Sequence, residues 1–391
     1  MLAKRLQYDD ALLEHLREIY GDDLKQLMES LLTPPRRLYL RVNLRRISRD
    51  ELLSMLRERG IMAYPDKYLE EAIYVEIKGP NKIPVTDARV VVDKKTAESV
   101  MMGANVYAPG VVDVPRTSPG REVNIVAPNG VLVGLGILVN NYEEALKKRK
   151  GIVVKTITSL YDAPKLRELP EWENGFFYEQ SYPSIIASRL LDKRKVKGYI
   201  VDMCAAPGGK LSHIASLCST TCEVLGFDRS GRKILETYKT LRRLGIGNAV
   251  LFKADSRYLD LDHSYLINRI RGVILDPPCS NLGVRPKVYD AKSFRDILSY
   301  AEYQKQFIKP AYKLLKSSGL LVYSTCTLTV EENEKVVAYA VEKYGFRVVD
   351  IDIGRKGIAR EAYFEGVFVG LRFEPHLHDT PGHFLSLLIK P

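Results

Sequence analysis

The sequence predicts an α/β protein in which a doubly wound, mainly parallel sheet follows a small α/β region and a small, strongly bent β-domain. Beyond residue 175, apolar strand-like runs alternate with segments of helical length, which is typical of a doubly wound sheet. Residues 84–165 are rich in Val, Gly and Pro and contain only short strand-like runs. These observations divide the chain into three domains, at residues 1–83, 84–165 and 166–391.

The N-terminal domain is expected to be helical first and α/β afterwards. Apolar residues recur at helical spacing over residues 9–32. Strand-like runs at 38–43 and 72–77 flank a segment in which Ser48 and Glu51 have the spacing of a capping box. This pattern predicts a strand, a helix and a second strand.

Arginines cluster in the same domain without an acidic residue between them. The cluster comprises Arg36, Arg37, Arg41, Arg45 and Arg46. A solvated charged surface and a face that contacts RNA phosphates explain such a cluster equally well. Arg41, Arg45 and Arg46 are therefore candidate RNA contacts.

Paired strand-like runs dominate residues 84–165. Asn129-Gly130 between two of them is a strong signal for a β-hairpin. A helix, Gly103-Ala104, Pro109-Gly110-Val111 and the paired runs, in this order, resemble the PUA domain, a pseudo-barrel that binds RNA. An unrelated small barrel is the alternative. A basic run beside the last strand would contact phosphates if the barrel binds RNA, and it consists of Lys147, Lys148, Arg149 and Lys150.

The C-terminal domain should contain seven strands, at residues 198–203, 224–228, 249–253, 272–276, 320–324, 346–351 and 384–389. Reactive groups in open α/β sheets gather at the carboxyl ends of the strands. Cys279 follows the fourth run in Leu-Asp-Pro-Pro-Cys-Ser, and Cys326 follows the fifth in Tyr-Ser-Thr-Cys-Thr. A thiol there can act as a nucleophile, because a nearby helix N-terminus favours the thiolate.

A sharp turn joins the first of these strands to a helix that opens at Leu211. Small residues and two glycines let the backbone approach a ligand at the helix N-terminus. The pattern is neither a Walker phosphate loop nor the spaced glycines of a dinucleotide fold, and a turn without a ligand is the alternative. The candidate cofactor-binding residues of this turn are Cys204, Ala205, Ala206, Pro207, Gly208, Gly209 and Lys210.

Acidic residues at three successive strand ends narrow the choice of cofactor. Asp228 lies 20 residues after Gly208 and could accept hydrogen bonds from ribose hydroxyls. Asp255 could receive an adenine amino group, and Asp276 ends the next strand. Together they favour an adenosine-bearing cofactor without a pyrophosphate, such as S-adenosyl-L-methionine.

Composition limits the partners and the compartment. The chain of 391 residues has a net charge of +11, which suits a polyanionic partner. Five cysteines without a repeated spacing do not indicate a disulfide framework, and Cys218 and Cys222 are expected to be small buried side chains. The start lacks the apolar core of a signal peptide, and no run is long enough for a membrane helix. A monomeric cytoplasmic enzyme without membrane contact is expected.

Three motifs in residues 204–327 have the order and spacing seen in one enzyme family. They are Cys-Ala-Ala-Pro-Gly-Gly-Lys, Asp-Pro-Pro-Cys-Ser and Ser-Thr-Cys-Thr. With the closing segment at 375–384, they resemble the Nol/Sun family of RNA cytosine-5 methyltransferases. The resemblance implies a Rossmann-like catalytic domain that uses S-adenosyl-L-methionine.

The resemblance also implies a role for each candidate catalytic residue. Cys326 would add to carbon 6 of cytosine, which makes carbon 5 electron-rich. Cys279 would serve product release, directly or through water. Asp276 would take up charge around ring nitrogen 3, if held protonated or hydrogen-bonded, and Lys210 would orient it or act electrostatically.

Two further predictions concern the surroundings of these residues. Thr329 and Glu332 have the spacing of a capping box, which would place a helix N-terminus just after Cys326. Structural or RNA-proximal roles are favoured over a metal cluster for three nearby histidines, and no metal is expected. These are His376, His378 and His383.

The RNA target is suggested by the domain order. A PUA-like domain ahead of the catalytic half resembles the branch that acts on the tRNA acceptor end, as does Gly283-Val284-Arg285-Pro286. Ser280-Asn281 departs from the usual Ser-Gly near the base. The implied target is a cytosine in the acceptor stem, with the PUA-like domain on the CCA end. The alternatives are a ribosomal RNA methyltransferase and a non-catalytic RNA-binding assembly protein.

Overall fold

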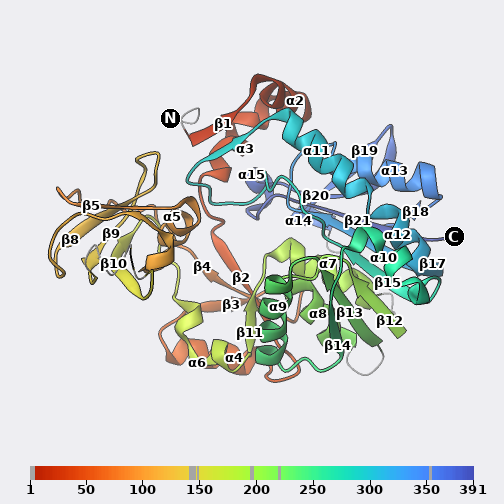
Figure 1. The fold of residues 1–391 in the computed structure, drawn as a ribbon, viewed down its shortest axis with the longest axis horizontal. Coiled ribbons are helices and arrows are strands. Elements are labelled where there is room, and N and C mark those ends of the chain that lie inside the picture. Colours follow the sequence, from red (N-terminus) through yellow and green to blue (C-terminus); the bar gives the residue numbers. More distant parts are fainter. Residues whose placement is uncertain (1–4, 141–146, 148, 194–197, 219–221, 352–354) are drawn as a thin grey trace.

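The computed structural model describes residues 5–140, 147, 149–193, 198–218, 222–351 and 355–391. Three larger sheets organise the molecule (Figure 1): a four-stranded sheet, a six-stranded β-domain at one end, and the long sheet of the C-terminal domain. The N-terminal, PUA-like and doubly wound parts expected from the sequence are all confirmed as folds. Within the described residues, no helix has both the length and the apolar character needed to cross a bilayer.

The four-stranded sheet has the order β11-β2-β4-β3 and is antiparallel throughout. Its strands are β2 (Arg37–Val42), β3 (Ala63–Pro65), β4 (Ala72–Glu76) and β11 (Phe177–Glu179). Helix α4 (Arg49–Glu58) packs on it, and the capping box is confirmed, because Ser48 and Glu51 exchange side-chain-to-backbone hydrogen bonds. Since β11 comes after the β-domain in sequence, the N-terminal and C-terminal parts share this sheet.

The first helices lie on the C-terminal domain rather than on the four-stranded sheet. Strand β1 (Leu6–Tyr8) pairs in parallel with β16 (Asp290–Lys292). Helices α2 (Asp10–Tyr20) and α3 (Leu24–Leu31) confirm the helical segment and are separated by a 3-10 turn. Their apolar side chains form a cluster with Leu282, Ile297 and Leu328.

The β-domain has the strand order β6-β10-β9-β8-β5-β7 around an apolar core. The predicted hairpin is confirmed, since β8 and β9 are antiparallel and are joined through Asn129-Gly130. Its elements are β5 (Arg89–Val92), α5 (Lys94–Val100), β6 (Val106–Tyr107), β7 (Val111–Asp113), β8 (Glu122–Val126), β9 (Leu132–Leu138) and β10 (Ile152–Ser159).

The long sheet has the order β14-β13-β12-β15-β17-β21-β20-β19, and β18 also pairs with β21. The first five strands are parallel and the others antiparallel, which confirms the doubly wound, mainly parallel sheet. The strands are β12 (Gly198–Asp202), β13 (Cys222–Asp228), β14 (Ala249–Lys253), β15 (Ile270–Leu275), β17 (Leu315–Thr325), β18 (Arg347–Val348), β19 (Arg360–Phe364), β20 (Val367–Phe373) and β21 (His383–Ile389).

Helices cover both faces of this sheet because alternate strand residues are apolar on each face. Ile200, Val224 and Val322 pack with α7 (Tyr182–Lys193) and α8 (Gly209–Cys218). Val201 and Leu321 pack on the other face with α10 (Leu259–Asp262), α12 (Ile308–Leu314) and α13 (Glu334–Tyr344). The remaining helices are α6 (Pro170–Glu173), α9 (Gly231–Leu244), α11 (Phe294–Lys305), α14 (Arg355–Ile358) and α15 (Pro375–His378).

The capping box predicted after Cys326 is wrong. Helix α13 begins only at Glu334, and its N-cap residue Asn333 makes no side-chain capping hydrogen bond. The Glu332 side chain turns into the protein and accepts hydrogen bonds from Ser280. Cys326 is therefore followed by a loop, and no helix N-terminus lies directly behind its sulfur.

Two other expectations differ from the structure. The run at 346–351 gives only the two-residue strand β18. Val349, the next residue, donates one backbone hydrogen bond to Leu387 O on β21 but is no longer part of the strand pairing. Cys218 and Cys222, expected as two separate buried thiols, are joined by a disulfide. Their Cα atoms are 5.6 Å apart, within the usual range for a bridge.

Candidate active site

The topology brings the three sequence motifs to one edge of the long sheet. The order of the strands reverses at β12, since β13 and β14 lie on one side of it and β15 and β17 on the other. The crevice at such a reversal is where open α/β sheets bind ligands. The glycine-containing turn follows β12, while Cys279 and Cys326 follow the neighbouring parallel strands β15 and β17.

The turn after β12 borders a cavity of about 200 Å³. Gly208 has a φ of +102°, which disfavours any side chain, and α8 begins at the next residue. The Ala205 N–H donates a 2.9 Å hydrogen bond to Phe227 O, which fixes the turn against β13. The predicted residues that line the cavity are Cys204, Ala205, Ala206, Pro207, Gly209, Lys210 and Asp276.

Sequence reasoning missed the opposite wall of this cavity. Tyr178 and Gln180 reach it from β11 and the residues after it, and Ser181 and Ser184 from the start of α7. These residues lie before the first predicted strand of the sheet, and nothing in their pattern marks a site. The cavity therefore lies between the turn after β12 and the shared four-stranded sheet.

Asp202 was also missed, although it ends β12 as the three predicted acids end their strands. It lines the cavity, is almost fully buried, and accepts a 3.1 Å hydrogen bond from the Cys204 N–H. Burial raises the pKa of Asp202 to about 7 in spite of that hydrogen bond. Its position at the end of a strand, like that of the three predicted acids, was the sequence signal that could have identified it.

Asp228 and Asp255 make local contacts at the ends of β13 and β14. Asp228 accepts a 2.9 Å hydrogen bond from the Ser230 N–H at the start of α9. Asp255 is paired with the Arg257 guanidinium at 2.6 Å, and this partner lowers the pKa of Asp255. Asp228, Asp255 and the cavity all lie at carboxyl ends of adjacent strands, which is the arrangement expected for an extended nucleoside site.

Lys210 and Asp276 form an ion pair at the cavity. Lys210 Nζ lies 2.6 Å from Asp276 Oδ2, and Ser324 donates a 2.8 Å hydrogen bond to Oδ1. Burial acts to raise the pKa of Asp276, but the Lys210 charge and these hydrogen bonds bring it below its ordinary value. Of the two expected forms of Asp276, the structure shows the hydrogen-bonded one, and the lowered pKa favours the carboxylate.

The two thiols lie next to each other, with 3.2 Å between the sulfur atoms of Cys279 and Cys326. Cys279 is buried, and its hydrogen bond with Cys326, together with burial, raises its pKa well above the ordinary value. Cys326 is the more exposed of the two. Cys279 is thus a protonated thiol at neutral pH, whereas Cys326 is open to a substrate.

Asn281 touches both sulfurs. Its Oδ1 accepts a 2.9 Å hydrogen bond from the Cys326 thiol and lies 3.6 Å from Cys279 Sγ. Its φ of +59° lies in the left-handed region, where glycine is favoured and asparagine is tolerated. The departure from Ser-Gly therefore places an amide beside the thiols.

The prediction that Arg41 is part of an RNA-contacting arginine cluster is wrong. This side chain is buried and cannot contact RNA, because it donates to Gln180 Oε1 at 2.7 Å, Gly209 O at 2.6 Å and Ser212 Oγ at 2.8 Å. It joins β2 to the start of α8 instead.

The other two predicted arginines are exposed but also contact the C-terminal domain. Arg45 donates to Asn248 Oδ1 at 3.2 Å. Arg46 donates to Arg243 O at 2.9 Å and to Asn174 O. Their guanidinium groups lie at the junction between the N-terminal and catalytic parts.

The basic run beside β10 is only partly described. Lys148 lies outside the described residues, and Lys147 and Lys150 are exposed. Arg149 donates to Val111 O at 2.8 Å and to Pro109 O at 2.5 Å, so it supports the β-domain itself.

The three histidines near the C-terminus face different partners. His376 lies 3.9 Å from Asp23, and His378 Nδ1 accepts a 2.9 Å hydrogen bond from the Glu374 N–H. His383 is fully buried on β21, and burial lowers its pKa to about 3. Over the described part of the chain, no three metal-binding side chains come together.

A doubly wound sheet with a small-residue turn, acids at successive strand ends and two thiols beside the cavity defines a methyltransferase that uses S-adenosyl-L-methionine. The turn and the acids suit an adenosine group, and the cavity lacks the phosphate-binding glycine pattern.

Comparison with known proteins agrees. The family model "16S rRNA methyltransferase RsmB/F" matches residues 189–389, a PUA model matches 88–160, and the ferredoxin-like domain of the same methyltransferases matches 8–81. The chain is therefore a member of the Nol/Sun, or RsmB/F, family of S-adenosyl-L-methionine-dependent RNA cytosine-5 methyltransferases.

Two curated relatives show how similarity is distributed. The tRNA (cytosine(72)-C(5))-methyltransferase of Pyrococcus horikoshii is 37% identical, over 98% of this chain and 98% of its own length. The human 28S rRNA (cytosine(4447)-C(5))-methyltransferase is 33% identical over 60% of this chain and 30% of its own length. Similarity to the tRNA enzyme thus extends over all three parts of the chain.

A solved structure has the same fold over the whole chain. The crystal structure of NSun6 from Pyrococcus horikoshii with SFG, an analogue of S-adenosyl-L-methionine, has a TM-score of 0.87 and 35% identity, with 98% of each chain covered.

Proposed function

We propose that this enzyme methylates carbon 5 of a cytosine in the acceptor stem of tRNA, the position 72 target named for its Pyrococcus relative. The observation that carries the chemistry is the thiol pair, 3.2 Å apart beside the cofactor cavity. The observation that supports a tRNA acceptor stem as the target is the presence of the PUA-like β-domain on the same chain.

Cys326 is the proposed nucleophile. Its sulfur is the more exposed of the two, and Cys326 directly follows β17, two residues after the Ser324 that bonds Asp276. A bond from its thiolate to carbon 6 moves electron density to carbon 5, so that one difficult step becomes two easier ones.

Cys279 is proposed to act in product release. After carbon 5 has been methylated, its hydrogen must leave as a proton before the bond between carbon 6 and Cys326 can break. The thiol of Cys279 lies 3.2 Å from the Cys326 sulfur and is protonated at neutral pH, so it serves release by holding the water that takes up this proton.

Lys210 and Asp276 are proposed to hold the target ring. Attack of the Cys326 sulfur at carbon 6 places negative charge on ring nitrogen 3, and the proton that the Cys326 thiol gives up, transferred through water, neutralises that charge on the nitrogen. The ion pair presents a donor and an acceptor side by side, with Asp276 fixed by Ser324. The Asp276 carboxylate can accept hydrogen bonds from the protonated nitrogen and the adjacent amino group, and the Lys210 ammonium can donate to the ring carbonyl oxygen.

The residues that would bind S-adenosyl-L-methionine are the turn 204–210 and the acids Asp202, Asp228, Asp255 and Asp276. The bound cofactor supplies the methyl group. The almost fully buried Asp202 fits this function, since its carboxyl group lines the cavity and could accept a hydrogen bond from a hydroxyl or amino donor of the cofactor.

The β-domain is proposed to bind the single-stranded CCA end, with Arg45, Arg46, Lys147, Lys148, Arg149 and Lys150 as candidate phosphate contacts. A paired cytosine in the stem would have to leave its stack to reach Cys326. We also propose that the protein acts as a cytoplasmic monomer of three domains, without membrane contact. Light scattering on the purified protein would test whether it is a monomer.

Transfer of labelled methyl groups tests the target. We expect methylation of intact tRNA transcript, at least about tenfold less of the same transcript without its CCA end, and none of a ribosomal RNA fragment. Equal methylation with and without CCA would refute the acceptor-end target. Methylation of the ribosomal fragment alone would favour the rRNA alternative, and no transfer to any RNA would favour a non-catalytic role.

A further inference from the structure

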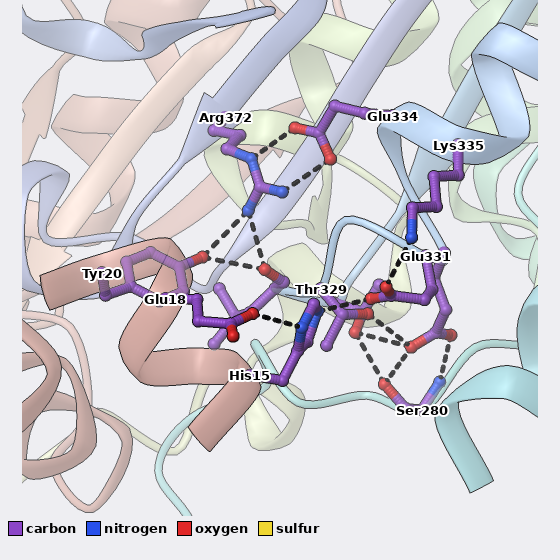
Figure 2. A network of polar contacts seen from close by, with 12 residues as sticks. His15, Glu18, Tyr20, Ser280, Thr329, Glu331, Glu334, Lys335 and Arg372 are labelled. Carbon is purple, nitrogen blue, oxygen red and sulfur yellow. Dashed lines mark hydrogen bonds and ion pairs between the residues drawn. The ribbon is translucent and has the colours of Figure 1, made fainter. Parts of the chain in front are cut away.

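The loop after Cys326 is fixed to the body of the protein on its outer side. Glu331 lies 2.6 Å from His15 on α2 and 3.1 Å from Lys335. Glu334 pairs with Nε and Nη2 of the Arg372 guanidinium on β20, at 2.5 and 2.6 Å. Figure 2 shows these contacts surrounding the segment between Thr329 and Glu334.

Arg372 also bonds to the backbone of this loop. Its Nη1 donates to Leu328 O at 2.7 Å and to the Tyr20 hydroxyl at 2.9 Å, and that hydroxyl donates to Leu328 O (Figure 2). Two elements distant in sequence, α2 and β20, therefore hold residues 328–334 in one place.

Glu332 lies on the inner side of the same loop and is fully buried. Its Oε1 accepts from the Ser280 N–H and from Gln304 Nε2, both at 2.9 Å. Its Oε2 lies 2.6 Å from the Ser280 hydroxyl and 3.0 Å from the Thr327 hydroxyl. All these partners are neutral donors, and a buried carboxylate requires such a complete set of hydrogen bonds.

The partners of Glu332 are the neighbours of the two thiols. Ser280 follows Cys279, and Thr327 follows Cys326. Gln304 also donates to Pro278 O, just before Cys279, at 3.1 Å. One carboxylate therefore ties together the two loops that carry the sulfurs, which come from separate strands.

We propose that Glu332 is a positioning residue that sets the distance between the sulfurs of Cys279 and Cys326. The inference rests on the proposed function for its purpose, because two thiols that act on adjacent ring carbons must keep their spacing while RNA enters. The charge of Glu332 also contributes to the raised pKa of Cys279, which favours the protonated form of that thiol. Glu332 itself touches neither sulfur nor RNA.

Oxidation of the thiol pair measures their spacing without RNA. Diamide accepts two electrons and two protons from Cys279 and Cys326 and leaves a disulfide between them, which peptide mapping quantifies. Wild-type protein should form this bond readily. Rates are compared at equal fractions of thiolate, so that loss of the Glu332 charge beside Cys279 does not itself change them. Glu332→Ala should then form the disulfide at least about tenfold more slowly, and Glu332→Gln, which keeps the shape and one acceptor oxygen, should lie between the two.

Glu331→Gln is the matched control. Glu331 is the adjacent residue, but it faces α2 and Lys335 rather than the thiol loops. This variant should match wild type in oxidation rate and in methylation. Circular dichroism on each variant checks folding, and Glu332→Gln decides the outcome if Glu332→Ala does not fold.

Methylation kinetics give the second measurement. A displaced thiol pair slows chemistry without changing how RNA binds, so kcat should fall about 100-fold in Glu332→Ala while KM for tRNA stays within about twofold. Unchanged oxidation in a folded Glu332 variant would overturn the proposal, whatever the kinetics. If the Glu332 variant oxidises more slowly but the wild-type protein methylates no RNA, the positioning role is supported and the proposed function is refuted.

Discussion

At the scale of single residues, the environments of the two thiols separate their roles. Cys279 is buried and its pKa is raised by the hydrogen bond with Cys326 and by burial, whereas Cys326 is accessible. We predict that Cys326→Ala abolishes methyl transfer, because no covalent bond to carbon 6 can form. Transfer of labelled methyl groups to tRNA measures this, and transfer at the wild-type rate would contradict the mechanism.

Cys279→Ala should have a different effect. Attack and methylation can proceed, but loss of the proton from carbon 5 slows, so a covalent complex of enzyme and RNA should accumulate. A denaturing gel with labelled tRNA would show it as a band of reduced mobility. The double variant with Cys326→Ala serves as control, since it should give no such band, and absence of the band in the single variant would exclude Cys279 from release.

Asp202 predicts a dependence of stability on pH. Its pKa is about 7 in the folded state, against an ordinary value of 3.8. The folded protein therefore binds a proton that the unfolded chain has lost, and stability falls as pH rises from about 4 to about 7, then levels off. The difference of about three units corresponds to at most about 4 kcal/mol.

Asp202→Asn should remove this contribution. We expect urea unfolding of the cofactor-free protein to show a smaller loss of stability between pH 4 and 7 in the variant than in wild type. Parallel curves for the two proteins would mean that Asp202 is ionised in the folded state.

At the scale of secondary-structure elements, Arg41 links β2 of the four-stranded sheet to the first turn of α8, which carries Lys210. We predict that Arg41→Met destabilises the protein by about 3 kcal/mol, since it removes charged hydrogen bonds and leaves Gly209 O without this donor. Thermal unfolding measures the change. The salt dependence of RNA binding should not change, because the side chain is buried.

Arg45→Met is the matched comparison. Arg45 is exposed, so stability should change by less than about 0.5 kcal/mol. If Arg45 contacts a phosphate, the slope of log affinity against log salt should fall by about 1. An unchanged slope would mean that Arg45 is an ordinary surface residue that does not contact RNA phosphates.

The same elements show what the sequence could and could not predict. The motifs at strand ends were predictable, because the chain order of β12, β15 and β17 places Cys204, Cys279 and Cys326 at one edge. Local spacing was insufficient at Glu332, where the capping pattern was present but tertiary hydrogen bonds from Ser280 and Gln304 drew the side chain inward. Arg41 looked like a surface residue for a similar reason, since its partners are over 130 positions away.

At the scale of the whole molecule, the β-domain and the catalytic site are joined by the loop after Cys279. Val288 from this loop is buried within the apolar core of the β-domain. Its N–H donates to Glu98 on α5 at 3.2 Å, and Lys94 on the same helix lies 3.1 Å from Asp290. The position of the β-domain is thus coupled to the loop that begins at the thiol.

This coupling predicts how the enzyme recognises the end of its RNA. Val288→Ala should loosen the contact by about 1 kcal/mol or more, through loss of buried methyl groups and the small cavity left behind. If the β-domain positions the CCA end relative to Cys326, the preference for intact over CCA-less tRNA in kcat/KM should fall several-fold. Val284→Ala in the same loop is the control, since Val284 is 40% exposed and should leave that preference unchanged. A full preference in a folded Val288→Ala protein would show that the two sites recognise RNA independently.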